Sequence, residues 1–205
     1  MKRCDLMDDV IKQVREKLKL FKKYGYDIPK AREFIISKAK LAKGGSMLEI
    51  GTGRGHMATL LAKKGFKFVS IDLDRKAQDA TRLHLKTTNR VKFVTLKIMN
   101  AEKLQYKDDF FYQVISVNFI HHAENPVRCL KEMIRVTKDK LIIADINRRG
   151  ERIMEKVHRL DGHSHEASKI SLLGVKKYLR RAGLVVRVYK DVCQTVIIAK
   201  KGAAK

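Results

Sequence analysis

Three glycines at alternate positions form the most informative stretch of the sequence. Gly51, Gly53 and Gly55 lie in L-E-I-G-T-G-R-G-H-M, directly after a short apolar run. Because glycine has no Cβ, a loop of this kind lets a ligand lie against the backbone. The dinucleotide fingerprint G-x-G-x-x-G would need a small residue at position 56, for close packing of a helix on a strand. His56 occupies that position, so the dinucleotide interpretation fails.

An acidic residue follows the next apolar run. Asp72, in F-V-S-I-D-L-D, lies 21 residues after Gly51. A carboxylate there can accept hydrogen bonds from both hydroxyls of a ribose, as in other nucleoside-binding α/β folds. Asp74 is the alternative, but its position favours the N-cap of the helix that follows.

Alternating apolar runs and amphipathic stretches must position these side chains. We expect strands at 47–50, 66–71, 91–96, 114–117, 140–146, 184–189 and 195–199, and helices near 55–64, 74–87, 126–137, 148–160 and 171–182. This alternation predicts an α/β fold, with a mostly parallel sheet covered by helices on both faces. Only about five residues separate the last two strands, too few for a crossover, which predicts a C-terminal antiparallel hairpin.

Two helices precede this pattern. Residues 5–24 carry an apolar stripe, with acidic residues at the start and lysines at the end, as the helix dipole favours. A second helix is expected from Pro29 to Ala42, closed by Gly44 and Gly45. We therefore divide the chain into an N-terminal helical extension or lid, residues 1–45, and an α/β domain, residues 46–205.

The glycine loop resembles motif I of the class I S-adenosylmethionine-dependent methyltransferases. Glu49 precedes Gly51 by two residues, as in that motif, and the order of strands is also similar to that family. The resemblance covers roughly residues 46–200. It implies a Rossmann-like, seven-stranded sheet and S-adenosyl-L-methionine as the cofactor.

The resemblance also implies which residues bind that cofactor. Asp72 would bind the ribose, Leu73 would pack near the adenine, and Asn100 would contact its amino group where many members have an aspartate. The alternative for Asn100 is a plain turn residue. The implied cofactor-binding set is Glu49, Gly51, Thr52, Gly53, Gly55, Asp72, Leu73, Asn100, Ala101 and Asn118.

Two departures from the family pattern accompany this match. Gln113 replaces an aspartate that is common just before the fourth strand's apolar run, and K-D-K at 138–140 replaces a usual Pro-Gly-Gly. We expect both at surface turns, with altered loops and intact cofactor binding.

Two adjacent histidines are the candidate catalytic residues. Methyl transfer from a sulfonium is an in-line displacement that needs mainly alignment and a deprotonated acceptor, so a base titrating near neutrality is useful. His121 and His122 follow the fourth strand, where the family's segment borders the methyl donor. We expect His122 to face the pocket, and His121 to pack or to contact the cofactor. The alternative is that both are ordinary loop residues.

A second histidine cluster lies in H-R-L-D-G-H-S-H-E, residues 158–166. We expect residues 148–170 to fold over the site and bring His163 or His165 to the acceptor. Together with Asp161 these histidines have the residue types of a metal site. Methyl transfer of this class usually needs no metal, so we expect none, and a polar loop and a metal site both stay open.

The composition of the chain limits its expected partners to those that suit a strongly basic protein, and it also bears on the compartment. The chain has 205 residues, with 46 Lys and Arg against 22 Asp and Glu, a net charge of +24 that attracts polyanions such as RNA. No apolar run is long enough to span a bilayer, and the first residues lack the apolar segment of a signal peptide. Three distant cysteines favour a reducing compartment. We expect a basic cytoplasmic protein with no membrane partner.

The sequence therefore predicts a transferase, an S-adenosylmethionine-dependent methyltransferase with a small-molecule acceptor. One alternative is an RNA (tRNA or rRNA) methyltransferase, suggested by the charge. The other is a basic nucleic-acid-binding module with a vestigial cofactor fold. Neither the Pro-Pro-aromatic motif of amino-group nucleic-acid methyltransferases nor a Pro-Cys nucleophile is present.

Overall fold

A single twisted sheet organises the protein. The structure is a computed structural model that describes residues 3–160 and 169–202, with described side chains in the first helix at residues 12 and 14–23. The strands are β1 (Met47–Ile50), β2 (Phe68–Asp72), β3 (Val94–Ile98), β4 (Phe111–Val117), β5 (Thr137–Ile146), β6 (Val185–Lys190) and β7 (Gln194–Lys200). Their order is β3-β2-β1-β4-β5-β7-β6, and β7 runs antiparallel to both of its neighbours. The predicted Rossmann-like fold with a C-terminal hairpin is confirmed.

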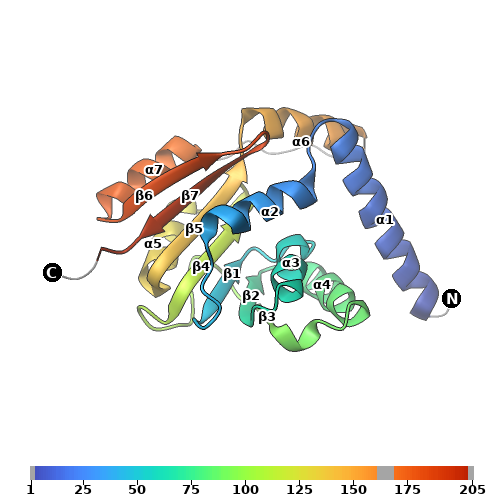
Figure 1. The fold of residues 1–205 in the computed structure, drawn as a ribbon, viewed down its shortest axis with the longest axis horizontal. Helices are drawn as coiled ribbons and strands as arrows, with labels where there is room; N and C mark the ends of the chain where they lie inside the picture. Colours follow the sequence, from blue (N-terminus) through green and yellow to red (C-terminus); the bar gives the residue numbers. More distant parts are fainter. Residues whose placement is uncertain (1–2, 161–168, 203–205) are drawn as a thin grey trace.

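Helices cover both faces of this sheet. They are α1 (Arg3–Lys23), α2 (Ile28–Ala39), α3 (His56–Lys63), α4 (Arg75–Thr87), α5 (Pro126–Val136), α6 (Arg148–Leu160) and α7 (Leu172–Arg181), with short 3₁₀ turns at Val91–Phe93 and Ile120–His122. Figure 1 shows α2, α3 and α4 on one side of the sheet, and α6 leaving the tip of β5. The helices α5 and α7 pack on the opposite face.

Adjacent residues of the central strands supply two separate cores, because side chains in a strand alternate between faces. Val114 and Leu141 belong to the cluster under α5 and α7. Their neighbours Ile115 and Ile142 belong to the cluster under α2, α3 and α4. Ile35 of α2 is fully buried in that second cluster, so α2 packs as a layer of the α/β domain. The division of the chain at residue 46 stays a prediction.

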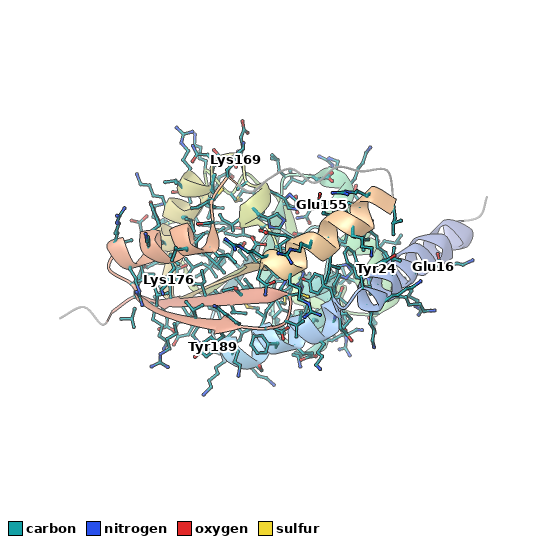
Figure 2. The ribbon with its side chains drawn as sticks, turned by 90° about the horizontal axis from the view of Figure 1, so that it is seen from above. Glu16, Tyr24, Glu155, Lys169, Lys176 and Tyr189 are labelled. Carbon is teal, nitrogen blue, oxygen red and sulfur yellow. The ribbon has the colours of Figure 1, made fainter. Side chains whose placement is uncertain are left out.

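A third cluster joins α1 and α6 beyond the strand ends. Phe21 at the end of α1 packs with Ile153 and Val157 of α6. The Lys156 ammonium lies over the ring of Tyr24, 4.4 Å from its centroid. In Figure 2, Tyr24 lies beside α6 at the end of α1. These contacts join the C-terminal end of α1 to α6 beyond the strand ends, and the rest of α1 runs away from α6 (Figure 1).

The end of α2 differs from the expected one. The helix stops at Ala39, because Lys40 adopts a left-handed conformation with φ 45° and donates its N–H to the Ile36 carbonyl. The expected terminators Gly44 and Gly45 lie farther along, in the link to β1. The periodicity of the apolar residues predicted the helix but did not indicate that it ends at Ala39.

The two departures from the family pattern do not lie at surface turns, so that expectation is wrong. Gln113 is fully buried in β4, where its amide accepts from the Ala42 N–H at 3.1 Å and donates to the Ala42 carbonyl at 2.8 Å. The segment 138–140 belongs to β5, which begins immediately after α5. The Lys140 ammonium is buried and donates to the carbonyls of Ala39 and Lys40, each at 2.9 Å. Gln113 and Lys140 therefore attach the end of α2 and the residues just after it to the sheet.

Replacing Lys140 by Met should destabilise the protein by about 1–3 kcal/mol, because two carbonyls at the end of α2 lose a charged donor. Urea denaturation of the variant measures this loss. Lys138→Met is the matched control, since Lys138 is an exposed residue of the same strand. Equal denaturation midpoints for the two variants would contradict the proposed role of Lys140.

Candidate functional site

The site lies where the order of strands reverses. β1 pairs with β2 on one side and with β4 on the other, and all three run parallel. At such a switch point the loops after the two central strands diverge and leave a crevice at their carboxyl ends, where α/β folds bind ligands. Gly51 follows β1 and Asn118 follows β4.

The three glycines of the loop serve different purposes. All have positive φ, of +83° at Gly51, +48° at Gly53 and +72° at Gly55. A Cβ on Gly51 would lie 2.7 Å from Phe119, and one on Gly55 would lie 2.5 Å from Thr81, so these two glycines permit close packing. A Cβ on Gly53 would meet no atom within 4 Å. Gly53 is therefore the glycine whose backbone faces open space that a ligand can fill.

Two cavities meet at this loop. One of about 300 Å³ is bounded by the glycine loop, α1, α2 and α6. The other, of about 220 Å³, lies over the ends of β2 and β3. Gly51 and His122 line both cavities. We call them the lid cavity and the strand-end cavity.

The strand-end cavity brings together four of the residues expected at the adenosine. Asp72, Leu73, Asn100 and Ala101 all line it. Leu73 is 67% exposed, so its apolar side chain is accessible to a ligand in this cavity. An apolar side chain beside polar groups suits the flat face of a base.

Asp72 already accepts two backbone hydrogen bonds. Its Oδ2 accepts from the Gly53 N–H at 2.7 Å, and its Oδ1 accepts from the Asp74 N–H at 3.0 Å. Each carboxylate oxygen keeps a second acceptor position, so the group can still bind a diol. Asp74 caps α4 through the Lys76 N–H, as expected.

Asn100 uses its side chain within its own turn. Its Oδ1 accepts from the Glu102 N–H at 2.8 Å. This bond is what the turn interpretation requires. The oxygen retains one acceptor position toward the strand-end cavity, so the adenine contact stays a prediction.

Glu49 ends a buried chain of hydrogen bonds. Ser70 donates to Glu49 Oε2 at 2.6 Å, Thr52 Oγ1 lies 2.6 Å from Ser70 Oγ, and Gln78 donates to Thr52 at 3.0 Å. The chain links β1, β2, the glycine loop and α4. Burial raises the pKa of Glu49 to about 8, although the Ser70 hydrogen bond and the charge of Arg32 act in the opposite direction. A cation in the lid cavity would favour the ionised carboxylate.

The two adjacent histidines have different surroundings. His121 is buried, and its Nδ1 lies 2.5 Å from Asp145 Oδ1 at the end of β5. Asp145 also accepts from the Ile146 N–H at 2.8 Å, which fixes the carboxylate. His122 is exposed where the two cavities meet, and its ring centroid lies 3.9 Å from that of His121. The His121–Asp145 pair therefore supports the wall beside His122.

Asn118 adopts a strained conformation at the end of β4, with φ 53°. Gln194 donates to Asn118 Oδ1 and to the Tyr26 hydroxyl, both at 2.7 Å. Asn118 also lines the lid cavity. These bonds fix the loop after β4 against β7 and the link between α1 and α2.

The expected acceptor residues lie outside the described part of the chain. His163 and His165, with Asp161, belong to 161–168, so neither their contact with an acceptor nor a metal site is tested. Among the described residues, no group of three or more His, Cys, Asp or Glu side chains could hold a metal ion. The adjoining part of α6 does reach the site, because Met154 and His158 line the lid cavity.

Sequence reasoning missed four polar residues of the site. Ser70 and Asp145 stand within apolar strands, Gln78 lies on α4, and Arg32 lies on α2. A signal was present for Arg32, because it stands between Ile28 and Ile35 on the apolar stripe of its helix.

The chain folds as a Rossmann-like α/β domain with a glycine loop and two cavities at its switch point. Residues 48–143 match the protein family described as "Methyltransferase domain". A crystal structure of a SAM-dependent methyltransferase from Aquifex aeolicus superposes with a TM-score of 0.65 at 20% identity, covering 83% of this chain and 89% of that one. Residues 48–143 are therefore similar to a methyltransferase domain, and the solved methyltransferase structure shares the fold of this chain.

Curated relatives share only part of their length with this chain. A ubiquinone biosynthesis O-methyltransferase of Vibrio vulnificus is 25% identical over 113 residues, 54% of this chain and 46% of the relative. An rRNA adenine N-6-methyltransferase of Escherichia coli is 29% identical over 93 residues, 45% of this chain and 36% of the relative. Within the described residues, no helix is long and apolar enough to cross a membrane.

Replacing Glu49 by Gln should remove a pH dependence from the stability of the ligand-free protein. The folded pKa is about 8 against an ordinary value of 4.5, so the folded protein keeps a proton that the unfolded chain releases between these values. The free energy of unfolding of the wild type should therefore fall as pH rises toward 8 and level off above it. Urea denaturation from about pH 5 to about pH 9 measures this slope.

The matched control is Glu151→Gln, at an exposed position on α6. It should keep the pH dependence of the wild type. A Glu49→Gln variant with the same slope as the wild type would show that Glu49 ionises normally.

Proposed function

We propose that the protein is an enzyme that transfers a methyl group from S-adenosyl-L-methionine to a small-molecule acceptor. The observation that carries this proposal is the pair of cavities that meet at Gly51 and His122. The strand-end cavity suits the adenosine, and the lid cavity suits the methionine part with the acceptor beyond it. Gly53 lines the lid cavity, and a Cβ on it would occupy space that this ligand could fill.

The cofactor supplies a methyl group bonded to a positively charged sulfonium sulfur. After transfer the sulfur leaves as a neutral thioether, so no anion has to be stabilised. The chain's own residues then have three tasks. Asp72 binds the ribose diol, and the glycine loop lets the ligand approach the backbone. The helices α1 and α6 cover the lid cavity and exclude water from it.

In this proposal His122 is the general base that deprotonates the acceptor. Its ring stands at the junction of the cavities, where the methyl donor and the acceptor would meet. An imidazole titrates near neutrality and can take the proton of a hydroxyl or ammonium acceptor. His121, held by Asp145, supports the ring of His122 from the buried side.

The enclosure of the lid cavity favours a small acceptor. Its walls come from α1, α2 and α6 as well as from the glycine loop, and about 300 Å³ matches the lower range of small-molecule sites. The Vibrio relative is named for a role in ubiquinone biosynthesis, which agrees with a small acceptor. RNA remains the second candidate because of the net charge of +24. Transfer of labelled methyl groups into an extract with and without RNase distinguishes the two.

Replacing Asp72 by Ala should weaken binding of S-adenosylmethionine by about 1.5–3 kcal/mol, because the ribose hydroxyls lose their acceptor. Titration calorimetry measures the affinity directly. Asp74→Ala is the control, since its carboxylate lies in the same turn but caps α4. Unchanged affinity in the Asp72 variant would refute the ribose assignment, and a wild-type protein that does not bind the cofactor would refute the proposed function.

Replacing His122 by Ala should lower kcat at least about tenfold at saturating cofactor, the effect expected for loss of a general base. The affinity for S-adenosylhomocysteine, measured by calorimetry, should change much less than kcat. His84→Ala, on α4, serves as the control. A kcat for the His122 variant equal to that of the control would mean that proximity alone drives the transfer.

A further inference from the structure

A half-buried lysine stands on the inner face of α1. Lys17 lines the lid cavity together with Val14, Leu18 and Phe21, whose spacing places them on the same side of the helix. Basic residues of an amphipathic helix ordinarily point to solvent. The other basic residues of α1 with described side chains are all exposed, namely Lys12, Arg15, Lys19, Lys22 and Lys23. Lys17 is therefore the basic residue among them that α1 presents to the cavity on its apolar face.

The apolar wall continues on α6. Met154 lines the lid cavity and packs against the cluster that joins the two helices, to which Leu18 and Phe21 also belong. His158 lies one turn farther along α6 and lines the cavity as well. The part of the lid cavity between α1 and α6 is thus largely apolar, with a few polar groups at its margin. Such a lining suits a ligand with an apolar body.

The walls of the lid cavity carry more positive than negative charge. Lys17, Arg32 and Arg54 line it as permanent cations. Among the described residues that line it, Glu49 is the one carboxylate, and burial raises the pKa of that group to about 8. Burial and the charges of the two arginines lower the pKa of His56 to about 4, so this ring stays neutral at pH 7. The ligand-free cavity is therefore positive near neutral pH.

The proposed cofactor would increase this excess. Its methionine part is a zwitterion without net charge, and its sulfonium is positive. Like charges enclosed in a small cavity repel one another more strongly than in water, because the local dielectric constant is lower. An acceptor with a negative charge would offset that repulsion, whereas a cationic acceptor would add to it.

We propose that the methyl acceptor is a small apolar molecule that carries a carboxylate, with its apolar body between α1 and α6 and its negative charge bound by Lys17 and Arg54. This inference rests on the proposed function and names the class of its acceptor. Arg54 stands between two glycines of the loop and is exposed at the cavity, where an anion can reach it. A guanidinium and an ammonium both donate charge-assisted hydrogen bonds to a carboxylate.

The test uses two probes with the same apolar body, phenylpropionate and phenylpropionamide, which differ by one negative charge at neutral pH. Calorimetry on the wild type saturated with S-adenosylhomocysteine should show that the carboxylate binds at least about tenfold more tightly than the amide. Acetate keeps the charge without the apolar body. It should bind at least about tenfold more weakly than phenylpropionate, because it buries much less apolar surface.

Lys17→Gln should weaken binding of phenylpropionate roughly tenfold and leave the amide nearly unaffected. Arg54→Gln should act in the same direction by about threefold, since an exposed charge is screened by solvent. It also provides a second variant if the Lys17 variant does not fold. Lys19→Gln is the matched control, because it removes the same charge from the exposed side of α1. It should bind both probes as the wild type does.

Three results would overturn this acceptor class while leaving the proposed function intact. The first is a wild-type protein that binds S-adenosylhomocysteine but does not prefer phenylpropionate to the amide, whether both bind alike or neither binds. The second is a preference that persists unchanged in both Lys17→Gln and Arg54→Gln. The third is acetate that binds as tightly as phenylpropionate. A wild-type protein that does not bind S-adenosylhomocysteine would instead overturn the proposed function.

Discussion

The attachment of α2 to the sheet is the contact on which the lid cavity depends, because α2 forms one of its walls. The Lys140 ammonium, buried in β5, donates to the two carbonyls at the end of this helix, and Gln113 of β4 holds Ala42 just beyond it. A buried ammonium would be costly without acceptors, and the carbonyls at the end of a helix are acceptors with a favourable dipole. The helix therefore cannot slide along the sheet without exposing that charge to an apolar surface. Arg32 lies on this helix, so its distance from Glu49 is fixed by the same attachment.

The glycine loop is fixed from the opposite side by packing and hydrogen bonds. Phe119 and Thr81 press against Gly51 and Gly55, and the Asp72 carboxylate accepts from the Gly53 N–H. Each of these partners comes from a different part of the chain, so the loop conformation depends on the whole sheet being assembled. A ligand in the two cavities meets a backbone that is already in place. Such preorganisation lowers the entropy lost on binding.

Much of the fold was predictable because it follows from periodicity and from loop length. The alternation of strands and helices and the short link before β7 indicated the parallel sheet and its antiparallel end. Gln113 and Lys140 could not be placed in the same way, because a polar residue within a strand carries no signal of the distant backbone that it binds. Both contacts span about 70 to 100 residues of sequence. The left-handed turn at Lys40 was also hidden, since lysine gives no local indication of positive φ.

The site itself was predictable to the extent that its residues belong to one motif. Gly51, Gly53 and Asp72 follow a spacing that can be read along the chain. Arg32 and Asp145 come from separate elements, and only the assembled sheet brings them to the motif. Glu49 shows what burial of such a residue costs. Its burial opposes ionisation and lowers the stability of the ligand-free protein near neutral pH, so packing alone would favour an apolar side chain. Arg32 adds a second buried polar group to the wall of the same cavity, and its Nε and Nη1 make no hydrogen bond that would offset the cost of burial.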